Sequence, residues 1–341
     1  PREPEARYCT LGRCRGGGGC RTVGGGDGIG DTDGVLPLVR LLQAGFLSAL
    51  AALAPAGAQS EPVQPVELWL ARWWNIANGL PQSTINDLLQ TENGELWIAT
   101  FGGLLRFDGV SFRSFDLNTL PELDSIRVTS LEADPRGGVW FATQSGSISR
   151  LVNGRIVESA RLSGSREILA LLRGQDGALW VQTSTGSVHR YADGAWKDVL
   201  AGGRGGRYQG LALASGGAIA VAYGKELVLF DARGEERARY ESPARVHAVA
   251  SAKDGGLWVG LEDGPARLVQ GEIRRYTTNP PIKMPVAAVR EDDDGHVWIG
   301  TPAGSVCIAI DSIFGSRMIV SSAERITSGF DVRTLLVDRE G

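Results

Sequence analysis

Short apolar segments alternate with glycine-rich turns along most of the chain. The pattern is clearest between Gly94 and Gly109, where Leu96–Thr100 and Leu104–Phe107 have the length and composition of two β-strands. A tight turn at Gly102–Gly103 joins them, so this stretch predicts a β-hairpin. The pattern recurs in weaker form about every 40 residues, and the positions aligned with its tryptophan are Trp97, Trp140, Trp180, Ile219, Trp258 and Trp298.

A further apolar strand is predicted ahead of each hairpin. Four short strands in a repeat of about 40 residues are typical of a β-propeller, in which each repeat forms one blade. We therefore predict an all-β fold, a β-propeller of about seven four-stranded blades over residues 66–341, with the last blade truncated. The expected inner strands are Ile85–Leu89, Val128–Leu131, Ile168–Leu172, Gly210–Leu213, Val246–Ala250, Val286–Val289 and Val332–Val337.

Two terminal segments bear on how such a ring closes. Val66–Ile76 contains three tryptophans and reads as a strand. In propellers an N-terminal strand commonly completes the last blade and covers its open edges, so we expect this segment to be the closing strand. Val332–Gly341 repeats the start of a blade and stops before its expected tryptophan.

Amino-acid composition excludes few classes of function. The 35 basic and 39 acidic residues give a net charge of −4, which argues against nucleic acid as the principal partner. The 341 residues could form two ordinary domains, but a repeat architecture runs as one.

Residues 1–34 differ from the rest of the chain. They are rich in Gly and Arg without periodicity, so we expect no packed structure there. If translation starts near Val35, these residues are not synthesised. Cys9, Cys14 and Cys20 do not have zinc-site spacing and have no histidine nearby. Cys307 lies in a predicted strand as a small apolar residue. We predict neither a metal nor a cofactor.

Residues 35–58 have the pattern of a secretory signal peptide. Arg40 precedes an apolar run, Ala44–Ala54, and three small residues follow it ahead of a cleavage site before Gln59. The run is too short to span a membrane, and residues 59–65 form a polar linker. The alternative is an ordinary helix in a cytosolic protein, but the small residues and the polar linker favour export.

The repeat closely resembles that of the two-component regulator propeller family. That family's repeat reads as an Asp-Gly turn, then Leu-Trp-Ile-Gly-Thr, then Gly-Leu and an aromatic residue. The likeness extends over about residues 66–341 and departs at Gly210–Gly234, which lacks the tryptophan and the turn aspartate, and at Leu261, which replaces the threonine. The segments that carry it are Trp74, Asn78–Pro81, Ile85–Gln90, Gly94–Thr100 and Gly103–Gly109.

The resemblance implies an extracytoplasmic ligand-binding sensor module of a bacterial signal-transduction protein. In that family an immunoglobulin-like module, a transmembrane helix and a histidine kinase or diguanylate cyclase follow the propeller. The resemblance thus implies a periplasmic domain of a protein anchored in the inner membrane, and it leaves a homodimer open. None of the later parts is in this chain, so we assign no enzymatic output to it.

The recurring residues have structural explanations. One tryptophan per blade would fill the wedge between neighbouring sheets, which favours packing over ligand stacking. The simplest interpretation of the aspartates that precede glycines is that they form tight turns. These residues are Asp176, Asp254 and Asp294. The run Glu291–Asp294 lacks the ligand spacing of a calcium loop, so a solvated turn is the preferred interpretation. Turn hydrogen bonds are expected from Thr100, Thr143, Thr183 and Thr301.

Catalytic machinery is hard to find. His189, His247 and His296 belong to three different blades, and no Ser-His-Asp order, nucleophile elbow or phosphate loop is present, so no catalytic residue is predicted. A propeller lyase or hydrolase with residues gathered from several blades remains the alternative function. A passive interaction scaffold is the third.

A ligand site is expected where the loops entering the inner strands converge. Five of the seven loops carry a cation, which would suit a carboxylate or a sulfate. Phe101 and Tyr223, in adjoining turns, could supply faces for a sugar ring. We therefore predict an anionic small molecule or oligosaccharide as the ligand, with solvated loop cations as the alternative. The cations are Arg127, Arg166, Arg207, Arg245 and Lys283.

Overall fold

The computed structural model describes residues 8–13, 69–74, 76, 80, 82, 84–164, 167–203, 210–278, 281–314, 317–325 and 331–338. Strand β1 (Tyr8–Arg13) pairs with β2 (Trp69–Trp74) in a two-stranded sheet. β1 lies in the segment for which the sequence predicts no packed structure, and β2 lies in the predicted closing strand. The predicted signal peptide and linker fall outside the described residues. Within the described part of the chain, no helix is long and apolar enough to cross a membrane.

The remaining strands form four-stranded antiparallel sheets, which we number as blades 1–6. Blade 1 consists of β3 (Ile85–Gln90), β4 (Leu96–Thr100), β5 (Gly103–Phe107) and β6 (Phe112–Phe115). Blade 2 consists of β7 (Val128–Ala133), β8 (Val139–Thr143), β9 (Ser147–Val152) and β10 (Arg155–Arg161). Blade 3 consists of β11 (Ile168–Arg173), β12 (Leu179–Thr183), β13 (Val188–Ala192) and β14 (Ala195–Leu200).

The second half of the ring repeats this order. Blade 4 consists of β15 (Leu211–Leu213), β16 (Ile219–Tyr223), β17 (Glu226–Phe230) and β18 (Glu236–Glu241), with the short 3-10 helix η2 (Ser215–Gly217) after β15. Blade 5 consists of β19 (Val246–Ser251), β20 (Leu257–Leu261), β21 (Gly264–Val269) and β22 (Glu272–Arg275). Blade 6 consists of β23 (Ala288–Glu291), β24 (Val297–Thr301), β25 (Gly304–Phe314) and β26 (Arg317–Arg325).

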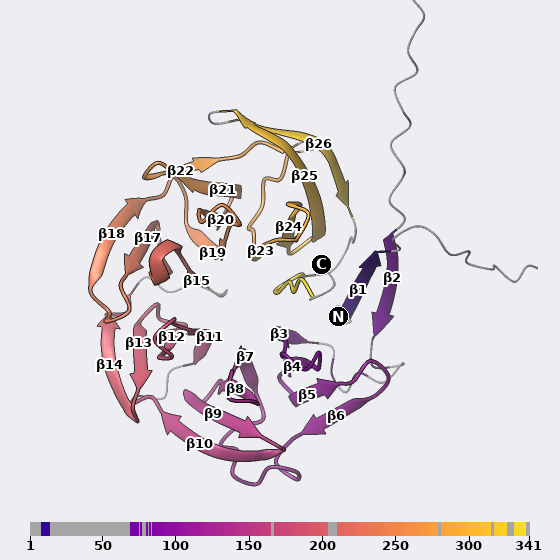
Figure 1. The fold of residues 1–341 in the computed structure, drawn as a ribbon, viewed down its shortest axis with the longest axis vertical. Helices are drawn as coiled ribbons and strands as arrows, with labels where there is room; N and C mark the ends of the chain where they lie inside the picture. The colour runs from indigo at the N-terminus through magenta and orange to yellow at the C-terminus, as the bar shows by residue number, and fades with distance from the viewer. Residues whose placement is uncertain are drawn as a thin grey trace, which may run out of the picture. The chain divides into compact units, whose positions relative to one another are not determined.

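The first strand of each blade lies nearest a common axis, and the fourth lies at the rim (Figure 1). The predicted all-β propeller is thereby confirmed. The predicted number of about seven blades is not, because the described residues form six. Val332–Val337, the seventh expected inner strand, is described but belongs to no sheet among the described residues.

The seventh segment nevertheless occupies the place of an inner strand. Val332 N–H donates to the carbonyl of Thr301 in blade 6 over 3.0 Å. Thr334 Oγ1 lies 3.4 Å from Asp87 Oδ1 in blade 1, and Leu336 packs against the core of the same blade. The segment therefore bridges the two ends of the six-blade array.

The hydrophobic core lies between neighbouring blades. Trp97 and Leu104 of blade 1 pack with Val128, Leu131 and Phe141 of blade 2, and each later pair of blades buries a similar cluster. The five repeat tryptophans are all buried, between 0% and 9% exposed. Burying both faces of each second strand is what makes a blade depend on its neighbours.

The hairpin glycines of the repeat meet a steric requirement. Gly103 has a φ of +137°, and a Cβ there would lie 2.8 Å from the carbonyl oxygen of Phe115 in the next strand. Only glycine permits both the backbone conformation and this close approach.

Candidate functional site

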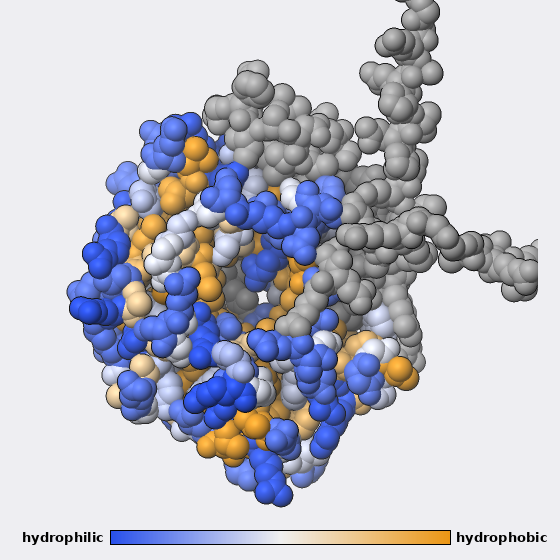
Figure 2. All heavy atoms as spheres, viewed as in Figure 1, coloured by the Kyte–Doolittle hydropathy of each residue, from blue (hydrophilic) through white to orange (hydrophobic). Residues whose placement is uncertain are grey.

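The two faces of the ring are built from different turns. The loops that precede the inner strands meet the turns between second and third strands on one face, which we call the entry face. The turns between first and second strands lie on the other, which we call the opposite face. The face seen in Figure 2 is largely hydrophilic, with smaller apolar patches between the blades.

On the entry face, two predicted ligand-binding residues come together. The guanidinium carbon of Arg127 lies 5.4 Å from the ring centroid of Phe101. Arg127 Nη1 donates to Gln144 Oε1 over 3.1 Å, and Gln144 Nε2 donates to Glu167 Oε1 over 3.2 Å. A continuous row of side chains therefore links the mouths of blades 1, 2 and 3.

Three further predicted site residues, Tyr223, Arg245 and Lys283, are described. Tyr223 donates its hydroxyl to the carbonyl of Ala201 over 2.9 Å. Arg245 is half-buried and Lys283 is exposed. Arg166 and Arg207 lie outside the described residues.

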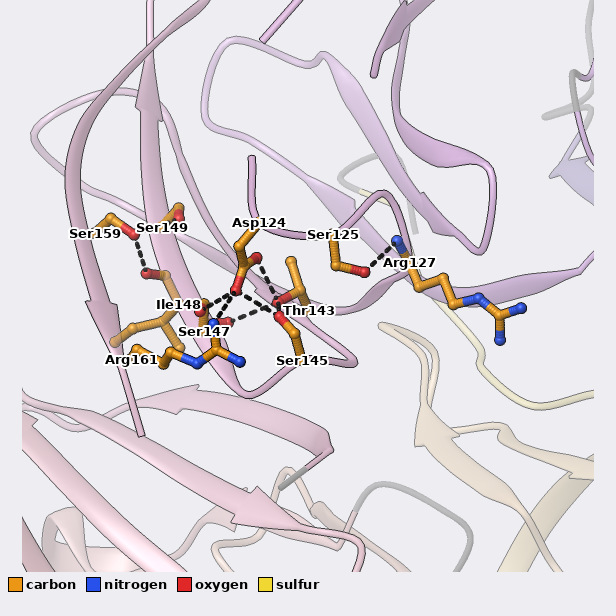
Figure 3. Close-up of polar contacts among 10 residues, drawn as sticks. All are labelled: Asp124, Ser125, Arg127, Thr143, Ser145, Ser147, Ile148, Ser149, Ser159 and Arg161. Atoms are coloured by element: carbon orange, nitrogen blue, oxygen red, sulfur yellow. Dashed lines mark hydrogen bonds and ion pairs between the residues drawn. The ribbon is translucent and has the colours of Figure 1, made fainter. Parts of the chain in front are cut away.

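Next to Arg127, the entry face carries a carboxylate that the sequence does not single out. Asp124, in the loop between β6 and β7, accepts hydrogen bonds from the hydroxyls of Thr143 at 3.2 Å, Ser145 at 2.5 Å and Ser147 (Figure 3). Arg161 Nη1 lies 3.7 Å from the same carboxylate. Partial burial would raise the pKa of Asp124, but the three hydroxyl donors and Arg161 hold it below its ordinary value.

This cluster anchors the entry loop to blade 2. The side chain of its neighbour Arg127 points away from the cluster (Figure 3). The signal was present in the sequence, because Thr143, Ser145 and Ser147 alternate along one hairpin. Which carboxylate would reach these hydroxyls depended on the fold of the loop, and the sequence did not specify it.

Blade 3 contains a hydrogen-bonded serine, histidine and aspartate. His189 Nε2 lies 2.9 Å from Ser187 Oγ, and its Nδ1 lies 2.7 Å from Asp198 Oδ1. Sequence reasoning, which found no Ser-His-Asp order, did not anticipate this group. However, Ser187 is only 2% exposed and its oxygen also lies 2.6 Å from Thr183 Oγ1. The group is closed to a substrate as it stands, and the pairing of β13 with β14 explains it as a cross-strand polar contact.

Sequence reasoning also missed an arginine that recurs opposite the tryptophans. Arg267 is paired across the hairpin with Trp258, and its guanidinium carbon lies 4.7 Å from the centroid of the indole ring. Arg267 also forms an ion pair with Asp254. The signal was an arginine nine or ten positions after four of the five tryptophans. In blades 2, 3 and 5 a turn aspartate thus binds this arginine as well as forming the turn, and in blade 1 Glu95 binds it. The ion pairs are Arg106–Glu95, Arg150–Asp134, Arg190–Asp176 and Arg267–Asp254.

One group of side chains in blade 6 has the composition of a metal site. Ligand atoms of Asp292, Asp294 and His296 lie within 4.8 Å of one another. Both oxygens of Asp292 are already engaged, because they accept hydrogen bonds from Trp298 Nε1 at 2.8 Å and from the backbone N–H groups of Asp294 and His296, and His296 Nδ1 lies 3.1 Å from Oδ2. A structural turn, as the sequence predicts for this run, accounts for the arrangement.

A cavity of about 520 Å³ opens on the opposite face, lined by residues of blades 1, 2 and 3 and by Leu213 of blade 4. Burial raises the pKa of Glu132 in its wall to about 7, and the Asp87 carboxylate acts in the same direction against a backbone N–H donated by Arg173. A carboxyl group with such a shift in a cavity is a candidate functional group. The charged and aromatic lining includes Glu95, Trp97, Glu132, Asp134 and Arg173.

Comparison with known proteins agrees with the repeat. Residues 79–102 match the family model described as two component regulator propeller, which confirms the resemblance inferred from the sequence. No curated protein matches the chain.

Several solved structures share the fold. A virginiamycin B lyase from Staphylococcus aureus superposes with a TM-score of 0.59 at 15% identity, covering 69% of this chain and 83% of that one. The extracellular domain of a putative hybrid two component system from B. thetaiotaomicron superposes with a TM-score of 0.60 at 16% identity. The match covers 78% of this chain and 39% of that one. YCF48 from Cyanidioschyzon merolae superposes with a TM-score of 0.51 at 14% identity, and the match covers 65% of this chain and 81% of that one. At these identities the likeness shows the fold alone.

Proposed function

We propose that this chain is the extracytoplasmic ligand-binding sensor module of a bacterial signal-transduction protein. The observation that carries the proposal is the match of residues 79–102 to the two component regulator propeller model, within a ring of the same repeat. The extracellular domain of a putative hybrid two component system shares the fold, which supports an extracytoplasmic location. The signal-peptide pattern of residues 35–58 supports export.

We propose the entry face as the place of ligand binding and an anion, such as an acidic oligosaccharide, as the ligand. Phe101 offers an aromatic face, and Arg127 beside it offers a guanidinium donor. Arg207 is one of the other entry-loop cations, together with Arg166, Arg245 and Lys283.

Calorimetry with an oligouronate and a neutral oligosaccharide of equal length tests this proposal. The oligouronate should bind, its affinity should fall with added salt, and the Arg127→Ala/Arg207→Ala double variant should weaken it by about tenfold or more. The matched control is Arg155→Ala/Arg237→Ala on the outer strands, which removes the same charge and should leave binding unchanged. Equal binding of the neutral sugar, or an affinity insensitive to salt and to the double variant, would contradict an anion site on this face.

A propeller lyase remains the second candidate, favoured by the fold shared with virginiamycin B lyase. The two proposals differ in the coding sequence expected downstream of Gly341. A membrane span with a kinase or cyclase domain would support the sensor, whereas a stop soon after one more blade would support the enzyme or a scaffold.

A further inference from the structure

The indole N–H of Trp97 is a buried donor without a hydrogen-bond acceptor among the described residues. Trp97 is 5% exposed and lines the cavity on the opposite face. A buried N–H that makes no hydrogen bond costs free energy, so its neighbourhood is a place to look for a ligand that supplies the acceptor.

Two other blades show which groups accept this hydrogen bond where it is made. In blade 6, the indole N–H of Trp298 donates to Asp292 in the turn of its own blade over 2.8 Å. In blade 5, Trp258 donates over 2.6 Å to Glu291, at the end of the inner strand of the next blade. In both cases the acceptor is a carboxylate.

Neither carboxylate is present around Trp97. The residue equivalent to Asp292 is Thr91, whose hydroxyl lies 2.6 Å from Asn93 Oδ1 and 3.0 Å from the carbonyl of Glu95. The residue equivalent to Glu291 is Ala133, by the pairing of each inner strand with the strand that follows it. Thr91 and Ala133 both line the cavity, which therefore opens where a glutamate side chain lies between blades 5 and 6.

A second donor lines the same cavity. Arg173 Nη1 is buried and makes no hydrogen bond within the described structure. Its nearest carboxylate oxygen, Asp134 Oδ1, is 3.7 Å away. Asp134 is itself engaged by Arg136 and Arg150.

The acidic residues of the wall do not exclude an anion. Glu95 forms an ion pair with Arg106 over 2.9 Å, Asp134 pairs with Arg136 and Arg150, and burial raises the pKa of Glu132 to about 7, toward its neutral form. These pairs leave Arg173 able to balance the charge of a bound carboxylate.

We propose that this cavity on the opposite face binds a small molecule through a carboxylate group, which accepts hydrogen bonds from Trp97 Nε1 and Arg173 Nη1. The carboxylate takes the place that Glu291 holds between blades 5 and 6. This site is on the face opposite to the entry-face site and does not depend on the sensor proposal.

The probe is D-glucuronate, with D-glucose as its neutral counterpart, added to the ¹⁵N-labelled full chain. Glucuronate should shift the indole N–H resonance that Trp97→Phe removes, and glucose should not. Trp97→Phe and Arg173→Gln should each weaken glucuronate binding by about tenfold or more, because each removes a donor to a charged acceptor. Trp180→Phe is the matched control, since it deletes another buried indole N–H without an acceptor, one outside the cavity lining, and it should leave binding unchanged.

The sharpest test introduces a carboxylate side chain at the position equivalent to Glu291. Ala133→Glu should place a carboxylate beside Trp97 as Glu291 is placed beside Trp258, abolish glucuronate binding and preserve the melting temperature. Arg127→Ala should leave this binding intact, which separates the site from the entry face. Absence of a glucuronate-induced shift, an equal shift with glucose, or full binding by Ala133→Glu would each overturn the proposal.

Discussion

Ser130 donates its hydroxyl to a buried carboxylate oxygen of Asp87 over 2.9 Å and so joins the inner strands of blades 1 and 2. The same oxygen accepts the backbone N–H of Leu131 at 2.9 Å, and Ser130 Oγ accepts the N–H of Leu171 in blade 3 at 3.0 Å. One carboxylate and one hydroxyl therefore connect three successive inner strands, β3, β7 and β11, around the axis (Figure 1).

Asp87→Ala should lower the free energy of unfolding by about 3 kcal/mol, because it leaves the Ser130 hydroxyl and the Leu131 N–H buried without their acceptor. Urea denaturation measures the loss. Ser130→Ala, which removes this donor and the acceptor of the Leu171 N–H but leaves the Asp87–Leu131 bond, should also be destabilising. Equal stability of Asp87→Ala and the unsubstituted protein would show that this connection does not support the ring.

Trp140→Ala should lower the free energy of unfolding by about 3 to 5 kcal/mol, because the ring is 5% exposed between blades 2 and 3. Thermal unfolding followed by circular dichroism checks the change. Trp140→Phe keeps most of the apolar contact and should cost less than half as much. An unchanged melting temperature for Trp140→Ala would contradict the packing role.

Asp124→Ala should release the loop between β6 and β7 and leave the blades folded. Hydrogen exchange of residues 116–127 should accelerate, while exchange in β8 and β9 should stay slow. Because the folded-state pKa of Asp124 is lowered, acid should produce the same release below about pH 3.8, as the carboxylate takes up a proton. Glu122→Ala, an exposed substitution in the same loop, is the control and should leave exchange unchanged.

Glu132→Gln should stabilise the protein at pH 8. The folded-state pKa of Glu132 is raised from 4.5 to about 7, so the folded protein holds this proton more tightly than the unfolded chain does. The contribution of Glu132 to stability is therefore full below pH 4.5 and is lost as the pH rises through 7. We expect a gain of up to about 3 kcal/mol for Glu132→Gln at pH 8 and none at pH 4.

That pH profile is measured by urea denaturation at each pH. The groups around Glu132 that set its titration are Asp87 and Arg173, and both remain in the variant. Glu122→Gln, at an exposed position, should show no such dependence. A constant difference between Glu132→Gln and the unsubstituted protein from pH 4 to pH 8 would rule out the raised pKa.

The exported protein should begin at or near Gln59, because small residues precede it after an apolar run. N-terminal sequencing of protein recovered from the periplasm checks this. A folded cytosolic product that retains residues 35–58 would contradict it.

The sequence by itself determined the propeller, its repeat and the boundaries of most strands. These features depend on local patterns: alternation of apolar residues, glycines at turns such as Gly103, and the spacing from Trp97 to Trp140. Strands and turns can be recognised from a few consecutive residues, because strand direction and turn geometry are set by the backbone of neighbouring positions. The repeat is recognised because the same short pattern recurs along the chain.

Only the tertiary structure decided which side chains meet between blades. Asp124 reaches the hydroxyls of blade 2, and Asp87 reaches Ser130, across about 20 and 43 positions of the chain. The cavity beside Trp97 exists because Ala133 of the next blade lacks the carboxylate that Glu291 offers to Trp258. Such contacts depend on the rotation of one sheet against the next and on the path of the loops. Those are set by the packing of the whole ring and are not encoded in any single repeat.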